Sequence, residues 1–296
     1  MSEIRIDSLL PAEMATRAEY LGVRKAEMPA FTTLMLAILA GAFISLGAIF
    51  ATTVAAGGVS ITGADGIAAY STGLPYGVTR LLTGLVFCLG LILVVVGGAE
   101  LFTGNNLIVM AWASGKVSTR DLLWNWAIVY LGNFIGSIGT AILMFFTRQY
   151  TFGSDAVGVT ALKIAVGKCD LGFIQAIALG ILCNGLVCLA VWLTFSARTT
   201  LDKIACIIFP ITAFVAAGFE HSIANMYFVP FALLVKMFDP EYMTRVGEKV
   251  AHLDLLTWKT FLLNNLLPVT IGNIIGGAAL VAAVYWVVFL RTKKSY

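Results

Sequence analysis

Two short segments carry ionisable and amide side chains at the same spacing in an otherwise apolar chain of 296 residues. GAELFTGN spans 98–105 and GFEHSIAN spans 218–225. Both read G-x-E-x-x-x-x-N, and their shared polar residues are Glu100, Asn105, Glu220 and Asn225. His221 follows the second carboxylate and has no counterpart in the first segment. Carboxylate and imidazole groups accept and release protons, so the pattern indicates either proton transfer or polar scaffolding.

The composition places these groups in a membrane protein. Hydrophobic residues make up 59% of the chain, charged residues only 12%, and the mean hydropathy is +0.93. Soluble domains carry about 25% charged residues. The polar N-terminus lacks the apolar core of a secretory signal peptide. The net charge of +3 indicates no particular partner, and we expect no nucleic-acid binding.

Six apolar runs are long enough to be membrane-spanning helices, since a span needs about 20 apolar residues. They cover 31–57, 76–114, 122–146, 173–197, 204–238 and 266–290. The second and fifth are too long for one span, and GAELFTGN and GFEHSIAN interrupt them. Transmembrane strands would alternate, and these runs do not. The sequence therefore predicts an all-α membrane protein with six transmembrane helices, the second and fifth of them interrupted.

Charged residues between the runs indicate the organisation and orientation of the chain. Residues 1–28 are polar, with apolar residues near helical spacing, which fits an amphipathic helix on the membrane surface or a solvated tail. Residues 29–290 form the six-helix membrane domain, and 291–296 form a tail. Lys and Arg gather in both termini and in the loops 116–121 and 197–203. By the positive-inside rule, both termini lie in the cytoplasm.

A second motif indicates that the chain is an internal repeat. LGNFIG at 131–136 and IGNIIG at 271–276 share x-G-N-x-I-G. Together with the first pair of segments, this motif makes helices one to three similar to helices four to six. Three helices per half, with both termini on one side, require the halves to have opposite topology. Inverted repeats with interrupted helices at matching positions are typical of transport proteins with a site near the membrane midplane.

The two carboxylates allow two interpretations. A Glu at the centre of a span costs about 2.5–3.5 kcal/mol on insertion scales, and here it occurs twice at equivalent places. In the first interpretation, Glu100, Asn105, Glu220 and Asn225 hydrogen-bond the backbone groups that each break leaves without helical partners. In the second, the carboxylates form a proton relay. The need to satisfy the backbone favours the structural role for all four residues.

His221 and Thr103 are the polar residues best suited to contact a substrate. An ionisable residue at a break in a membrane span is functional by default, and imidazole titrates near neutral pH. Thr103 lies in the first break, where it either hydrogen-bonds His221 or caps the following helix. Phe87, Leu91 and Phe214 precede the breaks and form either ordinary core or an apolar constriction.

Other kinds of site have no matching motif. The chain has no Gly-rich loop followed by Lys-Ser/Thr and no Cys/His spacing of a metal site. It has five cysteines, most of them in apolar runs, which argues against a disulfide framework. We therefore expect no cofactor and no metal.

The segments GAELFTGN, LGNFIG, GFEHSIANMY and LLPVTIGNIIGG together resemble the formate/nitrite transporter family. The resemblance covers essentially the whole chain. FCLGLILVV, GILCNGLVCLAVW and GFEHSIANM are most similar to the bacterial formate channels of that family. The resemblance implies an aquaporin-like fold, a homopentamer with one pore in each protomer, and a multi-pass protein surrounded by the lipid of the bacterial inner membrane.

The resemblance also implies roles for individual residues. Thr103 and His221 match a pore-lining Thr and His of the family, and Asn184 matches a pore-lining Asn. Lys168 matches a Lys near the pore mouth, where a cation raises the local anion concentration. The apolar constrictions that flank the pore His are matched by Phe87, Leu91, Leu101, Phe102 and Phe214.

We expect a channel that passes formate and related small monovalent weak-acid anions, with His221 sharing or donating a proton. Proton sharing would neutralise the anion in an apolar constriction, which otherwise opposes it by desolvation. The alternative is a nitrite or hydrosulfide channel on the same scaffold, because these branches share the break motifs. An intramembrane enzyme that uses Glu220 and His221 as acid and base is disfavoured, because no nucleophile or metal set accompanies them.

Overall fold

The structure is a computed structural model that describes residues 7–57, 60–62, 68–71 and 73–291. Parts of the expected terminal segments 1–28 and 291–296 lie outside these described residues. Within the described residues, six helices are long and apolar enough to cross a membrane, which confirms the predicted number. They are α2 (Ala30–Ala55), α3 (Tyr76–Gly97), α6 (Thr119–Thr147), α8 (Phe173–Ser196), α9 (Thr200–Ala217) and a composite span at Trp258–Phe289.

The composite span changes its helical form along its length. It consists of α12 (Trp258–Thr260), a π-helical segment (Phe261–Leu266), α13 (Leu267–Ile274), a second π-helical segment (Ile275–Ala283) and α14 (Val284–Phe289). It begins earlier than the predicted run 266–290, because Thr257 caps a helix whose first turns are partly polar. π-Helical turns are rare and occur often at functional sites.

Two helices end at matching glycines in the interior of the chain. Gly98 follows α3 with φ +77°, and Gly218 follows α9 with φ +78°. A residue with a side chain is strained in this left-handed conformation, whereas glycine adopts it readily and ends a helix. The first break leads into α4 (Phe102–Asn105), a 3₁₀ turn (Asn106–Ile108) and α5 (Val109–Ala113), and the second leads into α10 (Ser222–Phe238).

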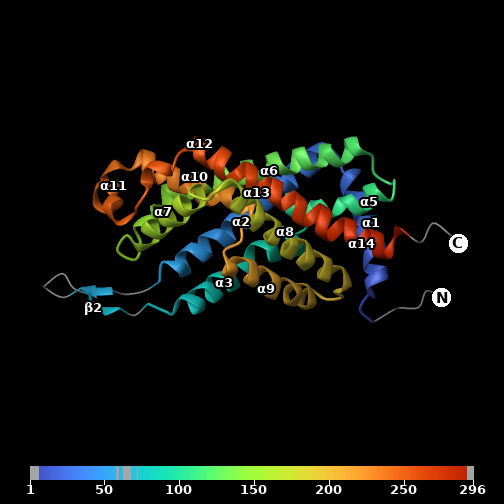
Figure 1. Cartoon of the computed structure of the whole chain (residues 1–296), viewed down its shortest axis with the longest axis horizontal. Helices are drawn as coiled ribbons and strands as arrows, with labels where there is room; N and C mark the ends of the chain where they lie inside the picture. The colour runs from blue at the N-terminus through green and yellow to red at the C-terminus, as the bar shows by residue number, and fades with distance from the viewer. Residues whose placement is uncertain (1–6, 58–59, 63–67, 72, 292–296) are drawn as a thin grey trace.

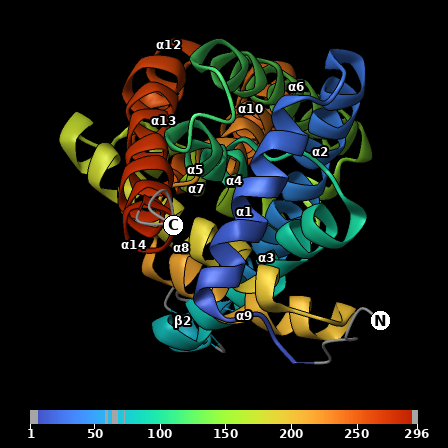
Figure 2. The same cartoon turned by 90° about the vertical axis from the view of Figure 1, so that its right-hand side faces the viewer.

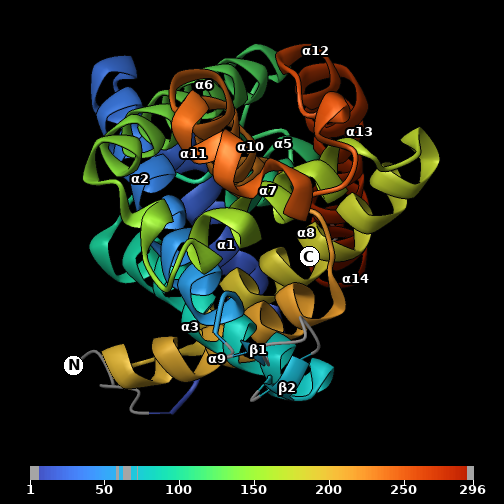
Figure 3. The same ribbon diagram turned by 90° about the vertical axis from the view of Figure 1, so that its left-hand side faces the viewer.

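The remaining elements lie at the two ends of the spans. They are α1 (Pro11–Ala26), β1 (Ser60–Thr62), β2 (Ala68–Ser71), α7 (Ala156–Cys169), α11 (Pro240–Val246) and 3₁₀ turns at Gln149–Thr151, Gly247–Lys249 and Leu253–Leu255. β1 and β2 pair antiparallel. Figure 1 shows α1, α5 and α14 at one end of the molecule and α7, α11 and β2 at the other. Figure 3 views the end that carries α7 and α11.

The N-terminal segment forms a helix that is packed onto the membrane domain. α1 buries Met14, Ala15, Ala18 and Gly22, while its other face stays exposed. A Cβ on Gly22 would lie 3.0 Å from the Cβ of Ala111, so α1 approaches α5 closely. Figure 2 shows α1 crossing in front of α8 and α9. This helix therefore covers one end of the space between the spans.

Glycines also allow close contacts between spans in both halves. α2 packs against α6, and α8 packs against the composite span. A Cβ on Gly136 would lie 2.0 Å from the carbonyl oxygen of Ile38, and one on Gly276 would lie 2.2 Å from that of Ile181. Gly136 and Gly276 are the last residues of the repeated x-G-N-x-I-G motif. Small residues at these positions let the helix backbones meet.

Candidate functional site

The two breaks meet in the interior of the protein, where Thr103 contacts His221. Thr103 Oγ1 and His221 Nε2 lie 3.0 Å apart, and the two residues are 0% and 2% exposed. His221 Nδ1 accepts a hydrogen bond from the backbone N–H of Ala224 at 3.1 Å. Because Nδ1 is an acceptor, the proton of the neutral ring is assigned to Nε2, which donates it to Thr103. The Thr103 hydroxyl hydrogen can then be donated to a substrate.

The same contacts distinguish the two interpretations of Thr103. The predicted hydrogen bond to His221 is present. The 3₁₀ turn Asn106–Ile108 and α5, which follow Thr103, have no side-chain cap, so Thr103 does not cap the following helix. In the second break, His221 itself caps α10 through Nδ1. The imidazole is therefore held at one nitrogen and presented to Thr103 at the other.

Apolar side chains surround this polar pair. The rings of Phe87 and Phe214 pack edge to face with centroids 5.7 Å apart. The Phe214 ring also stacks on the imidazole of His221 at 5.9 Å. Leu91 and Leu101 are each 2% exposed. An anion without its hydration shell is unstable among such groups unless it receives hydrogen bonds.

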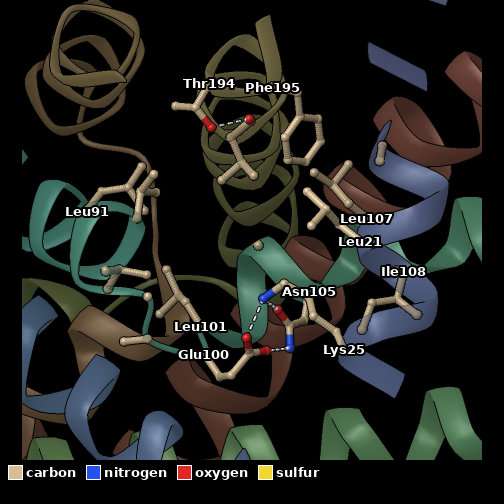
Figure 4. Close-up of a pocket in the computed structure, with 18 of the residues that line it drawn as sticks. Leu21, Lys25, Leu91, Glu100, Leu101, Asn105, Leu107, Ile108, Thr194 and Phe195 are labelled. Carbon is tan, nitrogen blue, oxygen red and sulfur yellow. Dashed lines mark hydrogen bonds and ion pairs between the residues drawn. The ribbon is translucent and has the colours of Figure 1, made fainter. Parts of the chain in front are cut away.

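A cavity of about 330 Å³ lies on one side of the pair, next to α1. Leu91 and Leu101 form its inner end, and Glu100, Asn105 and Lys25 line it farther out (Figure 4). Figure 4 shows these three polar side chains pointing toward one another. The cavity therefore passes from an apolar end to a polar wall.

A second cavity of about 320 Å³ lies on the other side of the pair. Phe87, Phe214 and His221 line its inner end, and Lys168 lines it with Glu220. Thr103 lines neither cavity. The polar pair and the apolar rings thus separate two cavities that each contain a lysine and a glutamate.

The second break is held by a network around Glu220. Lys168 Nζ donates to Glu220 Oε1 at 2.8 Å, and the two side chains are 14% and 7% exposed. Asn225 Nδ2 donates to Glu220 Oε2 at 2.6 Å and to Asn265 Oδ1 at 2.7 Å. Asn265 Nδ2 donates to the backbone oxygen of Lys168 at 3.0 Å. Asn265 belongs to the first π-helical segment, so that segment supports the network.

The first break has an equivalent network, with its lysine supplied by α1. Lys25 Nζ donates to Glu100 Oε1 at 2.6 Å and to Asn105 Oδ1 at 2.9 Å. Asn105 Nδ2 donates to Glu100 Oε2 at 2.7 Å and to Asn125 Oδ1 at 2.9 Å. Asn125 Nδ2 donates to the backbone oxygen of Lys25 at 3.1 Å. A lysine, a glutamate and two asparagines therefore make nearly the same bonds in both halves.

A further asparagine in each half satisfies the backbone of the break. Asn133 Oδ1 accepts the N–H of Phe102, and its Nδ2 donates to the backbone oxygen of Glu100, both at 2.9 Å. Asn273 makes the same two bonds at 2.9 Å in the second break. The sequence predicted that the Glu and Asn of each break would hold this backbone themselves. In the structure they bond a lysine and another asparagine. The backbone groups of each break are already bonded by Asn133 or Asn273.

Two other expected pore residues lie outside the cavities. Asn184 Nδ2 donates to the backbone oxygens of Asn273 at 2.7 Å and Thr103 at 3.3 Å, so it supports the carbonyl side of Thr103. The Phe102 ring packs edge to face on Tyr130, with centroids 4.9 Å apart, and borders neither cavity. As the first residue of α4, Phe102 faces α6, while the preceding Leu101 borders the first cavity.

The two networks differ at one acceptor. Asn105 Oδ1 accepts from Lys25, whereas Asn225 Oδ1 has no hydrogen-bond partner among the described residues. The Ser222 hydroxyl, beside His221, is likewise buried without a partner in this part of the chain. Asn225 lines the second cavity. A buried acceptor without a partner costs free energy, so this position suits a ligand or water that carries a hydrogen.

Sequence reasoning missed several members of these networks. Asn133 and Asn273 lie in the repeated x-G-N-x-I-G motif, which indicates the internal repeat but gives its asparagine no role. Asn125 and Asn265 have the same separation along the chain as that pair, and this repeat could have revealed them. Lys25 lies in the polar N-terminal segment, and nothing in its spacing indicates a contact with Glu100.

Comparisons with known proteins agree with the repeated motifs. The sequence profile of the family described as "Formate/nitrite transporter" matches residues 12–287. The chain belongs to the formate/nitrite transporter family. It is 44% identical over 291 residues to the formate channel FocA of Escherichia coli K12, covering 98% of each chain. It is 40% identical to FocA of Haemophilus influenzae, covering 92% of this chain and 91% of the other.

A solved structure gives the same result for the fold. A protein described as "Pentameric formate channel with formate bound" superposes with a TM-score of 0.77 and 45% identity, covering 88% of this chain and 98% of that chain. These relatives are channels or transporters. As a member of the formate/nitrite transporter family, this chain is a membrane transport protein rather than an enzyme.

Proposed function

We propose that this chain is a channel that passes formate, and other small monovalent weak-acid anions, across a bacterial inner membrane. The observation that carries the proposal is the buried Thr103–His221 pair, which lies between two cavities and among apolar rings. The 44% identity to a bacterial formate channel supports formate as the substrate.

The second cavity would receive the anion on one side of the membrane. Arg80, Lys163 and Lys168 line it together with the single carboxylate of Glu220, so the cavity attracts negative charge. The unpartnered Asn225 Oδ1 can accept a hydrogen bond from the hydration water that accompanies the anion. Further inward, Phe87 and Phe214 leave little polar surface. The anion loses water at this point and gains hydrogen bonds from the Thr103 hydroxyl and His221 Nε2–H instead.

The contacts of His221 bear on how a proton is handled. In the neutral ring, Nε2–H can be shared with an oxygen of formate once it leaves the Thr103 hydroxyl, and no change of protonation is needed. Donating a whole proton requires the doubly protonated ring, and Nδ1 would then have to release the N–H of Ala224. These contacts support sharing of the Nε2 proton by the neutral ring, because full donation would also require the loss of the bond from Ala224 N–H.

The test is formate flux into proteoliposomes, measured against pH for the wild type and His221→Asn. We expect the substitution to lower the flux about tenfold or more, since it removes a hydrogen bond to a charged group. It should also flatten the pH dependence. His252→Asn is the matched control, because it makes the same change at an exposed histidine in a surface loop. An unchanged rate and pH profile in His221→Asn would contradict the role of the imidazole.

Uptake of nitrite and hydrosulfide, measured beside formate, tests the substrate. Members of the formate/nitrite transporter family share the break motifs, so the scaffold alone does not select among these anions. We expect formate to be transported fastest. Transport of nitrite or hydrosulfide without formate flux would replace the leading proposal by the corresponding channel.

We also propose the finer architecture of the channel. The matching glycines of α3 and α9, and the equivalent networks at Glu100 and Glu220, support two inverted three-helix repeats with an aquaporin-like arrangement. The likeness to a pentameric channel structure supports a homopentamer. The basic short loops support cytoplasmic termini. The residues before α2 then form a helix, α1, at the cytoplasmic mouth, and its Lys25 contact makes it a candidate gate.

A further inference from the structure

Two further cations line the first cavity besides Lys25. Arg17 of α1 and Lys203 of α9 line it, so its walls at this point belong to different helices. Both side chains are half-buried. Within the described part of the chain, neither has a hydrogen-bond or ion-pair partner, whereas Lys25 is fully engaged.

The acidic residues on these elements do not neutralise the two cations. Glu13 of α1 accepts the backbone N–H of Leu10 at 2.9 Å, and Glu19 of α1 is paired with Lys116. The carboxylate of Asp202 accepts backbone N–H groups at the start of α9, at 2.9 and 3.1 Å. Glu100 is bonded to a lysine and an asparagine. The cavity is therefore lined by two positive charges that lack a partner of opposite sign among residues 7–57, 60–62, 68–71 and 73–291.

The size and lining of the cavity indicate what would bind there. Its volume of about 330 Å³ far exceeds the needs of formate, an anion of three heavy atoms. The wall also includes the apolar side chains of Leu21, Leu107 and Phe195 (Figure 4). Leu91 and Leu101 close the inner end. A ligand with two anionic groups on a short carbon spacer matches both the charges and the apolar wall.

We propose that Arg17 and Lys203 bind a small dicarboxylate in this cavity and that the bound ligand blocks the channel mouth. The ligand is too large and too highly charged to enter the apolar end, so it stays at the outer wall. It also joins α1 to α9 through its two carboxylates. Binding therefore holds α1 against the membrane domain, and the concentration of dicarboxylate on that side controls the flux.

Malonate binding to the purified full-length protein tests the site without any transport measurement. We expect calorimetry to detect malonate binding to the wild type. The malonate affinity of R17Q/K203Q should be at least about tenfold lower, since a hydrogen bond to a charged group contributes about 1.5–3 kcal/mol. Hydrogen exchange of the amides of α1 should slow with malonate in the wild type only. Arg120→Gln is the matched control, because Arg120 is an exposed cation near the start of α6 that does not line the cavity. Equal malonate affinity in R17Q/K203Q and the wild type would overturn the proposal.

Formate flux in oriented membrane vesicles tests the block. Malonate on the α1 side should lower the flux severalfold in the wild type and in Arg120→Gln, but not in R17Q/K203Q. The flux of the double variant should be the same with and without malonate. Equal block from both sides, or block that persists in R17Q/K203Q, would contradict a site between α1 and α9. This inference rests on the proposed function only for the block. If the protein does not transport formate, malonate binding and hydrogen exchange still test the site.

Discussion

The two lysine–glutamate pairs differ in exposure, and this difference predicts different costs of losing the lysine. Lys168 and Glu220 are 14% and 7% exposed, whereas Lys25 and Glu100 are 31% and 5% exposed. Removing one partner of a buried ion pair costs about 3–5 kcal/mol, because the other charge stays buried without compensation. We expect Lys168→Met to reach this range. Lys25→Met should cost about half as much, since water in the first cavity can reach Glu100.

The second substitution in each pair separates charge burial from lost packing. Adding Glu220→Gln to Lys168→Met removes the stranded carboxylate, and exchanging both members of a buried pair is often nearly neutral. We therefore expect the double variant to recover most of the stability lost in Lys168→Met. Asn225 Nδ2 can still donate to the amide oxygen of the new Gln, so the network keeps one of its bonds.

Thermal unfolding in detergent, followed by tryptophan fluorescence, measures the effect. A loss of about 3–5 kcal/mol lowers the midpoint by roughly 10 °C for a chain of this size. Lys25→Met with Glu100→Gln is the matched control cycle in the other half. The reasoning is refuted if Lys168→Met is as stable as Lys25→Met. It is also refuted if adding Glu220→Gln to Lys168→Met lowers the stability further instead of restoring it.

Three further substitutions test other parts of the structure. Phe214→Ala should raise the flux of larger monocarboxylates such as lactate relative to formate, because it removes half of the ring pair at the constriction; an unchanged ratio would place the size filter elsewhere. Gly136→Ala should lower the unfolding midpoint strongly, whereas Gly139→Ala, whose Cβ would meet nothing within 4 Å, should not. Asp239→Asn should destabilise the protein at neutral pH. Burial raises the pKa of the Asp239 carboxyl, but the hydrogen bonds from Tyr242 N–H and the Tyr150 hydroxyl have the larger combined effect. The pKa of Asp239 therefore lies below its ordinary value. The stabilisation is thus present above about pH 4 and lost below it, so the midpoints of variant and wild type should converge in acid, and a constant difference would contradict the assignment.

The spans and the pairing of the breaks could be predicted because they follow from short-range patterns. Apolar runs of sufficient length identify spans, and a Glu that recurs at the same spacing from a Gly and an Asn identifies equivalent breaks. The contact of Thr103 with His221 was one of two alternatives that the sequence allowed, since Thr103 lies three residues after Glu100 and His221 directly follows Glu220. All of these inferences depend on residue type and local spacing alone.

The composition of the networks could not be predicted in this way, because it depends on the meeting of distant elements. Lys25 reaches Glu100 from a helix that precedes the first span, and Lys168 reaches Glu220 from a helix between the third and fourth. The two lysines share no sequence motif. Asn265 lies where a π-helical segment alters which residues face inward, so α-helical periodicity does not place it.

The near-equivalence of the two networks makes their differences informative. Asn133 and Asn273 satisfy the backbone of both breaks, and each lysine–glutamate network holds the carboxylate of its own break. That leaves the position after each glutamate open to either an apolar or a polar residue, and it is Leu101 in one half and His221 in the other. Two leucines would leave the Thr103 hydroxyl without a ring partner in an apolar barrier. A single imidazole, held by α10 at Nδ1, supplies that partner while the opposite wall stays apolar. The repeat thus supplies a rigid frame, and the departure from repeat symmetry supplies the chemistry.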